Sequence, residues 1–551
     1  MTNKHVNAII VGAGASGGVV AKELATSGMS VMLFERGEWP NYDEHPNDEL
    51  ISQRTEVLGS PFGPDPLKNP RVLISKSGER QIVTPISGGY NNNAACVGSG
   101  TVSYGAMAWR LMEEDFKLRT VYGHVDGSTL EDWPITYEDL EPCYEKAEWE
   151  IGVSGDDTQN PFAPPRNKKQ PMPPFEYNHE AKVLCEASKR LGLHPFPIPM
   201  LRNSIPYNDR AGCIRNRTCV GFACPVDAKN GTQNTVIPIA IATGNCVLKT
   251  GSKVVEIMTN DHGKATGVRY FDQNDKPQIQ TADLVVITGA AVETARLLLN
   301  SKSKLFPNGL GNNNDWVGRN LMGHAYTAAC GLFDYDILDF SGPGATVAWC
   351  DFNHHNPGII GGGLLTNDFN RLPYLYTGMR PPGSAMWGKE HKEFQRSMYH
   401  RTARIMGPVQ EMPNFEARVT VDSKIKDFWG VPVAALSGEV HPLDYEHCKF
   451  LTNKAEEILK EAGAYQTWQN VGGKGGPSGY QHQNGTARMG NDKKTSVVNR
   501  YGQVHEIDNL FIADGSIMVN GGGFNPALTI MALGYWVGGY IAKTFATTKF
   551  K

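Results

Sequence analysis

Residues 6–18 read VNAIIVGAGASGG, and this stretch decides the fold. The apolar run at 6–11 predicts a short buried strand, the glycines follow at once, and residues 19–25 have the spacing of a helix. A second apolar run, SVMLFE, ends at Glu35. This order of strand, glycine turn, helix and strand is typical of a βαβ unit that binds a dinucleotide, whereas GxGxxG alone would equally fit a structural turn.

The three glycines of the motif have separate expected tasks. Gly12 permits the tight turn, Gly14 lets the backbone approach a pyrophosphate, and Gly17 allows close packing of the helix. The N-terminus of that helix supplies N–H donors and partial positive charge. The carboxylate of Glu35 would hydrogen-bond the ribose hydroxyls and repel a 2′-phosphate, which favours FAD or NAD over NADP. The motif does not separate FAD from NAD.

The composition is that of a globular protein. The chain has 551 residues, 40% of them hydrophobic and 20% charged, which is long enough for two domains or one elaborated domain. A net charge of -4 without a basic stripe argues against a nucleic-acid partner. The apolar segment 528–541 is short and contains glycines, so we expect a buried helix and no transmembrane segment. The first residues lack the features of a secretory signal, so we expect a cytoplasmic protein.

We predict an α/β fold, α+β overall, in which a discontinuous Rossmann-like domain alternates along the chain with an antiparallel-sheet domain. Strand patterns at 246–250, 253–258 and 283–290 resume the α/β character after a proline-rich excursion. From 326 to 475, strand-like runs such as ARVTVDS and long Gly/Pro loops predict the antiparallel sheet. The expected segments are 1–156, 206–325 and 479–551 for the nucleotide domain, and 157–205 and 326–478 for the substrate domain.

Two late segments carry further motifs, HQNGTARMG from residue 482 and ADGSIMVNGGGFNPALTI from residue 513. Together with GAGASGG, VGSGTVSYGAMAWR (97–110), TGAAVETARLLLNS (288–301) and VGRNLMGH (317–324), they resemble the glucose-methanol-choline (GMC) oxidoreductase family over nearly the whole chain. The resemblance implies a flavoprotein whose FAD is bound by the discontinuous α/β domain. It also implies a substrate bound under an antiparallel sheet on the other side of the flavin.

The resemblance assigns roles to individual residues. His482, which alone would be read as a core or loop histidine, matches the family's catalytic histidine, and Asn525 matches the second member of the pair. A neutral imidazole can take the hydroxyl proton while a hydride leaves carbon for flavin N5, because the ordinary histidine pKa of about 6.5 lies near working pH. Asn525 would hold the same oxygen by a hydrogen bond. The expected cofactor contacts are Gly12, Gly14, Ala15, Ser16, Gly17, Glu35, Arg36, Gly98, Ser103, Val255, Ala290, Asp514, Gly515, Asn525 and Pro526.

Four of these contacts have a specific expected role. A helix is predicted with Asn525 as its N-cap and Pro526 as its first residue, so that its N-terminus stabilises negative charge on the reduced flavin. Asp514 is expected to bond a hydroxyl or water, because a carboxylate would repel the phosphates. Ser103 corresponds to the position at which some sugar oxidases of the family carry a histidine bonded to FAD. The FAD is therefore predicted to be non-covalent.

Three cysteines, Cys213, Cys219 and Cys224, form a C-x5-C-x4-C-P pattern. Thiolates so close in sequence could hold a [3Fe-4S] cluster, whereas zinc would need a fourth ligand. Similar loops occur in the flavin subunits of sugar dehydrogenases, where a cluster passes electrons to a cytochrome, although Asn216 replaces an additional cysteine of some of them. Free cysteines that pack the loop are the alternative.

The cysteine loop and residues 97–110 most resemble the large subunits of glucoside 3-dehydrogenases and the related pyranose and glycoside 3-oxidases. This implies FAD-dependent oxidation of a ring hydroxyl, at C3 or C2, of glucose or a glucoside, with a cytochrome acceptor and a small subunit that could carry the export signal to the periplasm. An oxidase that uses O2, a nicotinamide enzyme and a non-catalytic flavin-binding subunit are the alternatives. The candidate sugar contacts, which would equally suit a core or a loop, are Trp349, Asn367, Asp368, Tyr374, Tyr376 and Trp387.

Overall fold

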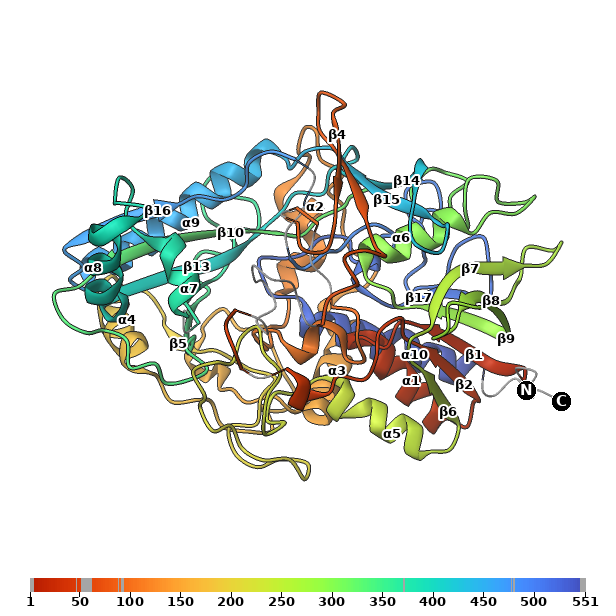
Figure 1. Cartoon of the computed structure of the whole chain (residues 1–551), viewed down its shortest axis with the longest axis horizontal. Helices are drawn as coiled ribbons and strands as arrows, with labels where there is room; N and C mark the ends of the chain where they lie inside the picture. The colour runs from red at the N-terminus through yellow and green to blue at the C-terminus, as the bar shows by residue number, and fades with distance from the viewer. Residues whose placement is uncertain are drawn as a thin grey trace.

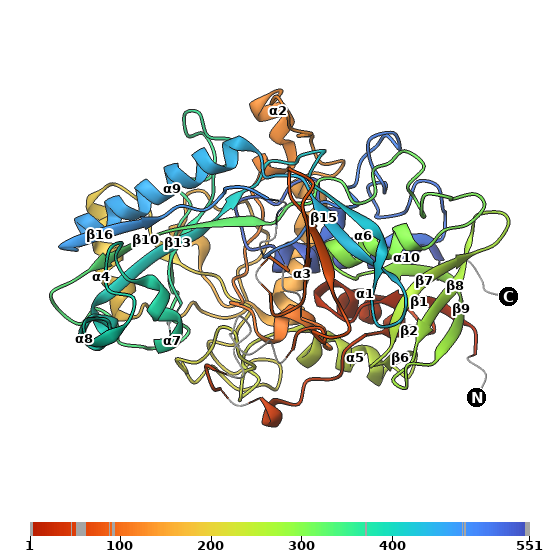
Figure 2. The same ribbon diagram turned by 45° about the horizontal axis from the view of Figure 1, so that its top comes forward.

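The computed structural model describes residues 4–45, 47–50, 62–87, 89–90, 94–369, 372–476, 478 and 481–545. Two bodies, each built around its own sheet, lie side by side in views that differ by 45° (Figure 1, Figure 2). Each sheet takes strands from distant parts of the sequence, so neither body is one continuous segment.

The first sheet contains the strands predicted at the N-terminus. Its parallel part has the order β6 (Cys246–Lys249), β2 (Val31–Phe34), β1 (Val6–Val11) and β9 (Pro277–Ile287), with β17 (Leu510–Ile512) on the other side of the end of β9. Every residue of β2 and of β17 is buried. Burial on both faces is why these strands are continuous apolar runs instead of alternating ones.

An antiparallel ribbon and four packed helices complete this body. Strand β8 (Ala265–Phe271) pairs antiparallel with the first half of β9, and β7 (Lys253–Thr259) pairs antiparallel with β8. Helix α1 (Ala15–Thr26) packs against α5 (Val236–Ala242) and α10 (Ala527–Phe545), and α10 packs against α3 (Tyr137–Ala147). The buried helix predicted at 528–541 is thereby confirmed. None of the helices in the described ranges is long and apolar enough to cross a membrane.

The second body contains the predicted antiparallel sheet. Its six strands have the order β16 (Gln466–Asn470), β10 (His324–Leu332), β13 (Thr402–Gln410), β12 (Leu365–Asn367), β11 (Val347–Trp349) and β5 (Phe196–Pro197). Helix α9 (Pro442–Glu461) packs on β10 and β13, and α4 (His179–Arg190) packs on α9. Phe333, Trp349 and Leu451 are buried in the core between sheet and helices. The predicted fold class is confirmed.

A third, four-stranded sheet differs from the expectation. The ARVTVDS run forms strand β14 (Arg418–Lys426), but β14 pairs with β15 (Pro432–Ser437), which runs parallel to β3 (Arg71–Ile74) of the hairpin with β4 (Arg80–Val83). Local alternation specifies a strand but not the sheet it joins, and here β15 joins β14 to β3 from much earlier in the chain. Helix α6 (Ala291–Asn300) packs against β7, β14 and β15. The remaining helices are α2 (Leu118–Tyr122), α7 (Pro373–Tyr376) and α8 (Gly388–Met398).

The register of the first sheet brings three loops together. Val11 at the end of β1 and Ile512 at the end of β17 both pair with Ile287 at the end of β9. The residues that follow, which include Gly12 and Asp514, must therefore lie at one edge of the sheet. This edge is where parallel α/β sheets bind ligands.

Candidate active site

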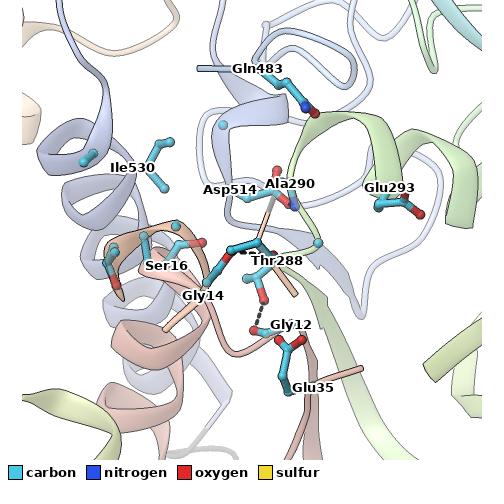
Figure 3. A pocket seen from close by; sticks show the side chains of 18 of the residues that line it. Gly12, Gly14, Ser16, Glu35, Thr288, Ala290, Glu293, Gln483, Asp514 and Ile530 are labelled. Atoms are coloured by element: carbon cyan, nitrogen blue, oxygen red, sulfur yellow. Dashed lines mark hydrogen bonds between the residues drawn. The ribbon is translucent and has the colours of Figure 1, made fainter. Parts of the chain in front are cut away.

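A cavity of about 340 Å³ lies at this edge, between the two bodies. Its walls come from the β1–α1 turn, from residues 94–107, from the β9–α6 turn and from residues 481–483 and 514–530. Strand β10 of the second body contributes Tyr326. Figure 3 shows Glu35 and Gln483 toward opposite ends of the labelled residues, with Asp514 and Ala290 between them.

The β1–α1 turn forms a cradle that only glycine can make. Gly12 has φ +110°, and a Cβ at this position would lie 2.5 Å from the carbonyl oxygen of Thr288. The Thr288 hydroxyl donates a hydrogen bond of 2.8 Å to the Gly12 carbonyl (Figure 3). Helix α1 begins directly after Gly14, and no side chain caps its N-terminus. Because Gly14 lines the cavity, the uncapped end of α1 is an anion-binding position.

Glu35 stands beside this turn at the end of β2. Its side chain is buried, and its two oxygens accept the N–H groups of Ala13 and Gly37, each at 3.0 Å. Burial raises the pKa of this carboxyl, although the two amides and Arg36 oppose the shift. A carboxylate oxygen has more than one lone pair, and Glu35 lines the cavity, so it can also accept a bond from a ribose hydroxyl.

A buried ionic network forms the neighbouring wall. Glu293 pairs with Arg71 at 2.7 Å and with Arg296 at 3.4 Å. Burial would raise the pKa of Glu293, but Arg71, Arg36 and Arg296 hold it well below its ordinary value. Burial and the nearby Arg296 lower the pKa of Lys253 to about 7. Removing one member of such a network leaves an uncompensated buried charge, so the wall is held by mutual pairing.

Asp514 joins the loops after β9 and β17. One carboxylate oxygen accepts from the Ala290 N–H at 3.0 Å and from the Thr294 hydroxyl at 2.6 Å. The other accepts from the Ser516 N–H at 2.9 Å and from the Ser516 hydroxyl at 2.5 Å. Burial raises the pKa of Asp514, against the effect of these donors. The carboxylate thus bonds hydroxyls and amides of the protein, and its four bonds fix this part of the wall.

His482 and Asn525 line the same cavity, together with Tyr326. The Asn525 Nδ2 donates to the Tyr326 hydroxyl at 2.8 Å, and the Asn525 Oδ1 accepts from Trp109 Nε1 at 3.1 Å. The rings of Tyr326 and His482 have centroids 5.8 Å apart. His482 has φ +70°, a strained value for a residue other than glycine that is typical of functional sites.

Asn525 does not act as the predicted N-cap. Helix α10 begins at Ala527, and the carbonyl of Pro526 accepts the N–H of Ile530 at 2.8 Å, so the helix starts one residue later than expected. The physical reason is that the Asn525 amide is engaged by two aromatic side chains from other elements. Tyr326 and Trp109 were missed by the sequence analysis. Strand alternation offered a signal for Tyr326, because residues two apart in β10 share a face.

Three predicted cofactor contacts do not line the cavity, while the other twelve do. A Cβ on Gly17 would lie 1.8 Å from the Gly12 carbonyl oxygen, so Gly17 faces the turn. The N–H of Gly98 donates to the Ala13 carbonyl at 2.8 Å, and the Ser103 carbonyl accepts from the Gly221 N–H at 2.7 Å. These residues support the cavity wall from behind.

The six candidate sugar contacts all lie outside the cavity wall. Trp349 and Tyr376 are buried in the second body, and Asn367 uses its amide to bond neighbouring backbone and Glu180. Asp368 pairs with Arg404 at 3.1 Å. The other two, Tyr374 and Trp387, are 40% and 85% exposed. The sugar contacts stay a prediction, and side-chain type alone does not distinguish a binding wall from a core or a surface loop.

The structure does not support the cluster predicted at the three cysteines. Among the described residues, no group of three His, Cys, Asp or Glu side chains is placed to hold a metal ion. The Cys213 sulfur accepts the Arg215 N–H at 3.3 Å. Burial raises the pKa of Cys219, but Arg202 and Lys229 together lower it below its ordinary value. The charges of Cys219 and Cys224 add to the burial that raises the pKa of Cys213.

Comparisons with known proteins agree with this architecture. Two family models, both described as GMC oxidoreductase, match residues 128–326 and 413–534. The chain is 30% identical over 530 residues to 6'''-hydroxyparomomycin C oxidase of Streptomyces lividus, covering 95% of this chain and 89% of that protein. It is 26% identical over 565 residues to the fructose dehydrogenase large subunit of Gluconobacter japonicus, covering 97% of each.

A solved structure of formate oxidase from Aspergillus oryzae RIB40 superimposes with a TM-score of 0.63 at 14% identity, covering 98% of this chain and 99% of that chain. At this identity the likeness concerns the fold alone. The family models and the relative at 30% identity go further, because the models match more than half of the chain, including His482 and Asn525, and the relative covers 95% of it. The chain therefore belongs to the GMC oxidoreductase family.

Proposed function

We propose that this chain is an FAD-dependent oxidoreductase that oxidises a secondary ring hydroxyl, at C3 of glucose or a glucoside, to a keto-sugar. One observation carries the proposal: a single cavity joins the dinucleotide motif to His482 and Asn525. The sugar class is supported by the resemblance of residues 97–110 and of the cysteine loop to glucoside 3-dehydrogenases, and by the fructose dehydrogenase relative.

The residues around the cavity fit FAD. The uncapped N-terminus of α1 would hold the pyrophosphate, and a Cβ on Gly14 would lie 3.2 Å from Ser99 Cβ, so a larger residue there would fill the cradle. Glu35 would bond a ribose hydroxyl. The N-terminus of α10, at Pro526 and Ala527, lines the far part of the cavity and would favour negative charge on the reduced ring.

Non-covalent attachment is proposed from the same wall. The cavity-lining residues of segment 99–107 include neither histidine nor cysteine; they are Ser99, Gly100, Thr101, Tyr104, Gly105, Ala106 and Met107. Acid denaturation should release the flavin into the supernatant. Flavin that stays with the precipitated protein would contradict this attachment.

Two side chains of the protein carry out the other parts of the proposed reaction. His482 takes the hydroxyl proton of the substrate. The Asn525 Oδ1 is bonded to Trp109 and one Nδ2 hydrogen is directed to Tyr326, so the second Nδ2 hydrogen is the one that can hold the substrate oxygen. When bound, FAD would supply the acceptor for the hydride that leaves the same carbon with the C–H electron pair. The alcohol thus loses one proton and one hydride and becomes a ketone.

For the electron acceptor we propose a partner protein, because the fructose dehydrogenase relative is named as a large subunit. The Streptomyces relative is named an oxidase, so oxygen is the competing acceptor. A [3Fe-4S] cluster would add a second cofactor. Iron analysis and EPR spectra of anaerobically purified protein test it, and a lack of iron after reconstitution would remove the cluster from the proposal.

The proposed function is tested by anaerobic reduction. Glucose or methyl glucoside should bleach the flavin absorbance of the wild-type protein, and NMR of the product should show a ketone at C3. The His482→Ala variant should keep its FAD but lose reduction. A wild-type flavin that no sugar reduces contradicts the substrate class, and a His482→Ala variant that reduces at the parental rate contradicts the role of His482. Comparing turnover with oxygen and with a soluble one-electron acceptor separates the two acceptor hypotheses.

A further inference from the structure

A second histidine, His324, contacts His482 and belongs to no predicted site. It is the first residue of β10 and is 0% exposed. Its Nδ1 lies 3.1 Å from the His482 Nδ1, and its Nε2 lies 2.8 Å from the carbonyl oxygen of Gly522. The two rings have centroids 5.1 Å apart and planes inclined by 72°. Both nitrogens of His324 therefore have defined partners.

The backbone holds these two rings together. The His324 N–H donates to the Gln481 carbonyl at 3.1 Å. Two residues away, Met322 and Asn484 exchange backbone bonds of 3.1 Å and 2.9 Å. The chain segment before β10 thus pairs with the segment that carries His482. This backbone pairing brings the two residues together, and the contact between their Nδ1 atoms joins the rings.

The partner of His324 Nε2 decides where the protons lie. A carbonyl oxygen can only accept, so the His324 Nε2 must carry a hydrogen. A neutral imidazole carries one hydrogen, so the Nδ1 of a neutral His324 has a lone pair and accepts. The Nδ1 of His482 must then be the donor. In a neutral His482 the lone pair is consequently on Nε2.

The surroundings keep His324 neutral. Burial lowers its pKa to about 4, although the backbone of Gly522 and the charge of Asp115 favour the protonated form. Asp115 is itself paired with His354 at 3.1 Å. On the other side, Glu411 of the segment after β13 accepts the N–H of Gly323 at 2.8 Å. Protonation of His324 would place a hydrogen on each of the two facing Nδ1 atoms.

We propose that His324 is a positioning residue that fixes the tautomer of His482, holding the hydrogen on His482 Nδ1 so that Nε2 is the atom that receives the substrate proton. This inference rests on the proposed role of His482. His324 does not itself take the proton. Its function is comparable to that of the acidic member of a catalytic triad, except that the orienting group here is a neutral acceptor.

Substitution of His324 tests the proposal through His482. His324→Leu removes the acceptor at similar volume, whereas His324→Asn keeps an oxygen acceptor near the position of Nδ1. The rate constant of anaerobic flavin reduction should fall on the order of 10²-fold in His324→Leu, and the asparagine variant should recover much of this loss. KM should change little, since positioning acts on the chemical step. If the leucine variant lacks bound flavin, His324→Met replaces it.

A matched control comes from another buried histidine. His447 in α9 is 0% exposed, burial likewise lowers its pKa to about 4, and its Nε2 accepts the Ile360 N–H at 3.3 Å. It lies outside the cavity wall, so His447→Leu should leave the reduction rate near the parental value. A loss in this variant equal to that of His324→Leu would show that the effect is general core damage.

The double variant His324→Leu/His482→Ala gives the sharpest outcome. If His324 acts only through His482, the double variant should reduce no more slowly than His482→Ala alone. The proposal is overturned if His324→Leu lowers the rate in the His482→Ala background, if it keeps the parental rate, or if asparagine rescues nothing. The proposed function has a separate test, because it fails if the His482→Ala variant alone has the parental activity.

Discussion

The substitution Gly17→Ala tests whether the β1–α1 turn binds the pyrophosphate of FAD. A Cβ on Gly17 would lie 1.8 Å from the Gly12 carbonyl oxygen, against at least 3.4 Å in ordinary contact, so the start of α1 must move away from the turn by about 1.6 Å. Such a shift breaks hydrogen bonds from the helix N-terminus to a bound pyrophosphate. Two bonds to a charged group contribute about 3–6 kcal/mol. The expected loss of FAD affinity is therefore roughly 10²- to 10⁴-fold.

Flavin content is measured by the ratio of flavin absorbance to protein absorbance, and affinity by titration of apoprotein with FAD. Gly539→Ala is the matched control, because a Cβ there meets nothing within 4 Å in helix α10. This control should retain FAD and gain up to about 1 kcal/mol of stability, since alanine favours a helix over glycine. A Gly17→Ala variant that binds FAD with parental affinity would refute the assignment of this turn to the pyrophosphate.

Two further predictions concern the two ends of the cavity. Tyr326→Phe removes the hydroxyl that bonds Asn525. The loss of a hydrogen bond with a net contribution of about 1 kcal/mol should slow flavin reduction roughly fivefold, and Trp109→Phe should have the same effect. Stopped-flow rates at the parental value in both variants would contradict the role of Asn525. Lys253→Met removes a group whose pKa falls from 10.5 to about 7 on folding. Between these two pKa values the unfolded wild-type chain binds more protons than the folded one. The free energy of unfolding of the wild type should therefore rise relative to that of the variant from pH 7 to pH 10. Urea unfolding of both proteins at both pH values measures this, and an equal stability difference between wild type and variant at pH 7 and pH 10 would contradict it.

The nucleotide half of the site was predictable because its signals are local. The order of apolar run, glycine turn, helical spacing and terminal Glu35 lies within thirty residues, and the structure forms β1, α1 and β2 from it. Gly12 and Gly14 line the cavity as expected. The apolar runs of β1 and of the last part of β9 were also visible as strands, although their parallel pairing was not predicted.

The other half depends on contacts that no local pattern encodes. Trp109 and Tyr326 reach Asn525 from separations of 416 and 199 residues. The contact between His324 and His482 likewise spans 158 residues. The motif VGRNLMGH ends at His324, so the sequence marked this residue without indicating its partner. Only the pairing of the two backbone segments brings the two rings into contact.

The structure of the FAD complex is the most direct test of the central claim, that one cavity brings a flavin and the imidazole of His482 together. We expect the pyrophosphate at the N-terminus of α1 beside Gly14, and the isoalloxazine ring next to His482 and Asn525. A flavin ring bound away from both side chains, or a His482 whose Nε2 faces away from the ring, would contradict the mechanism.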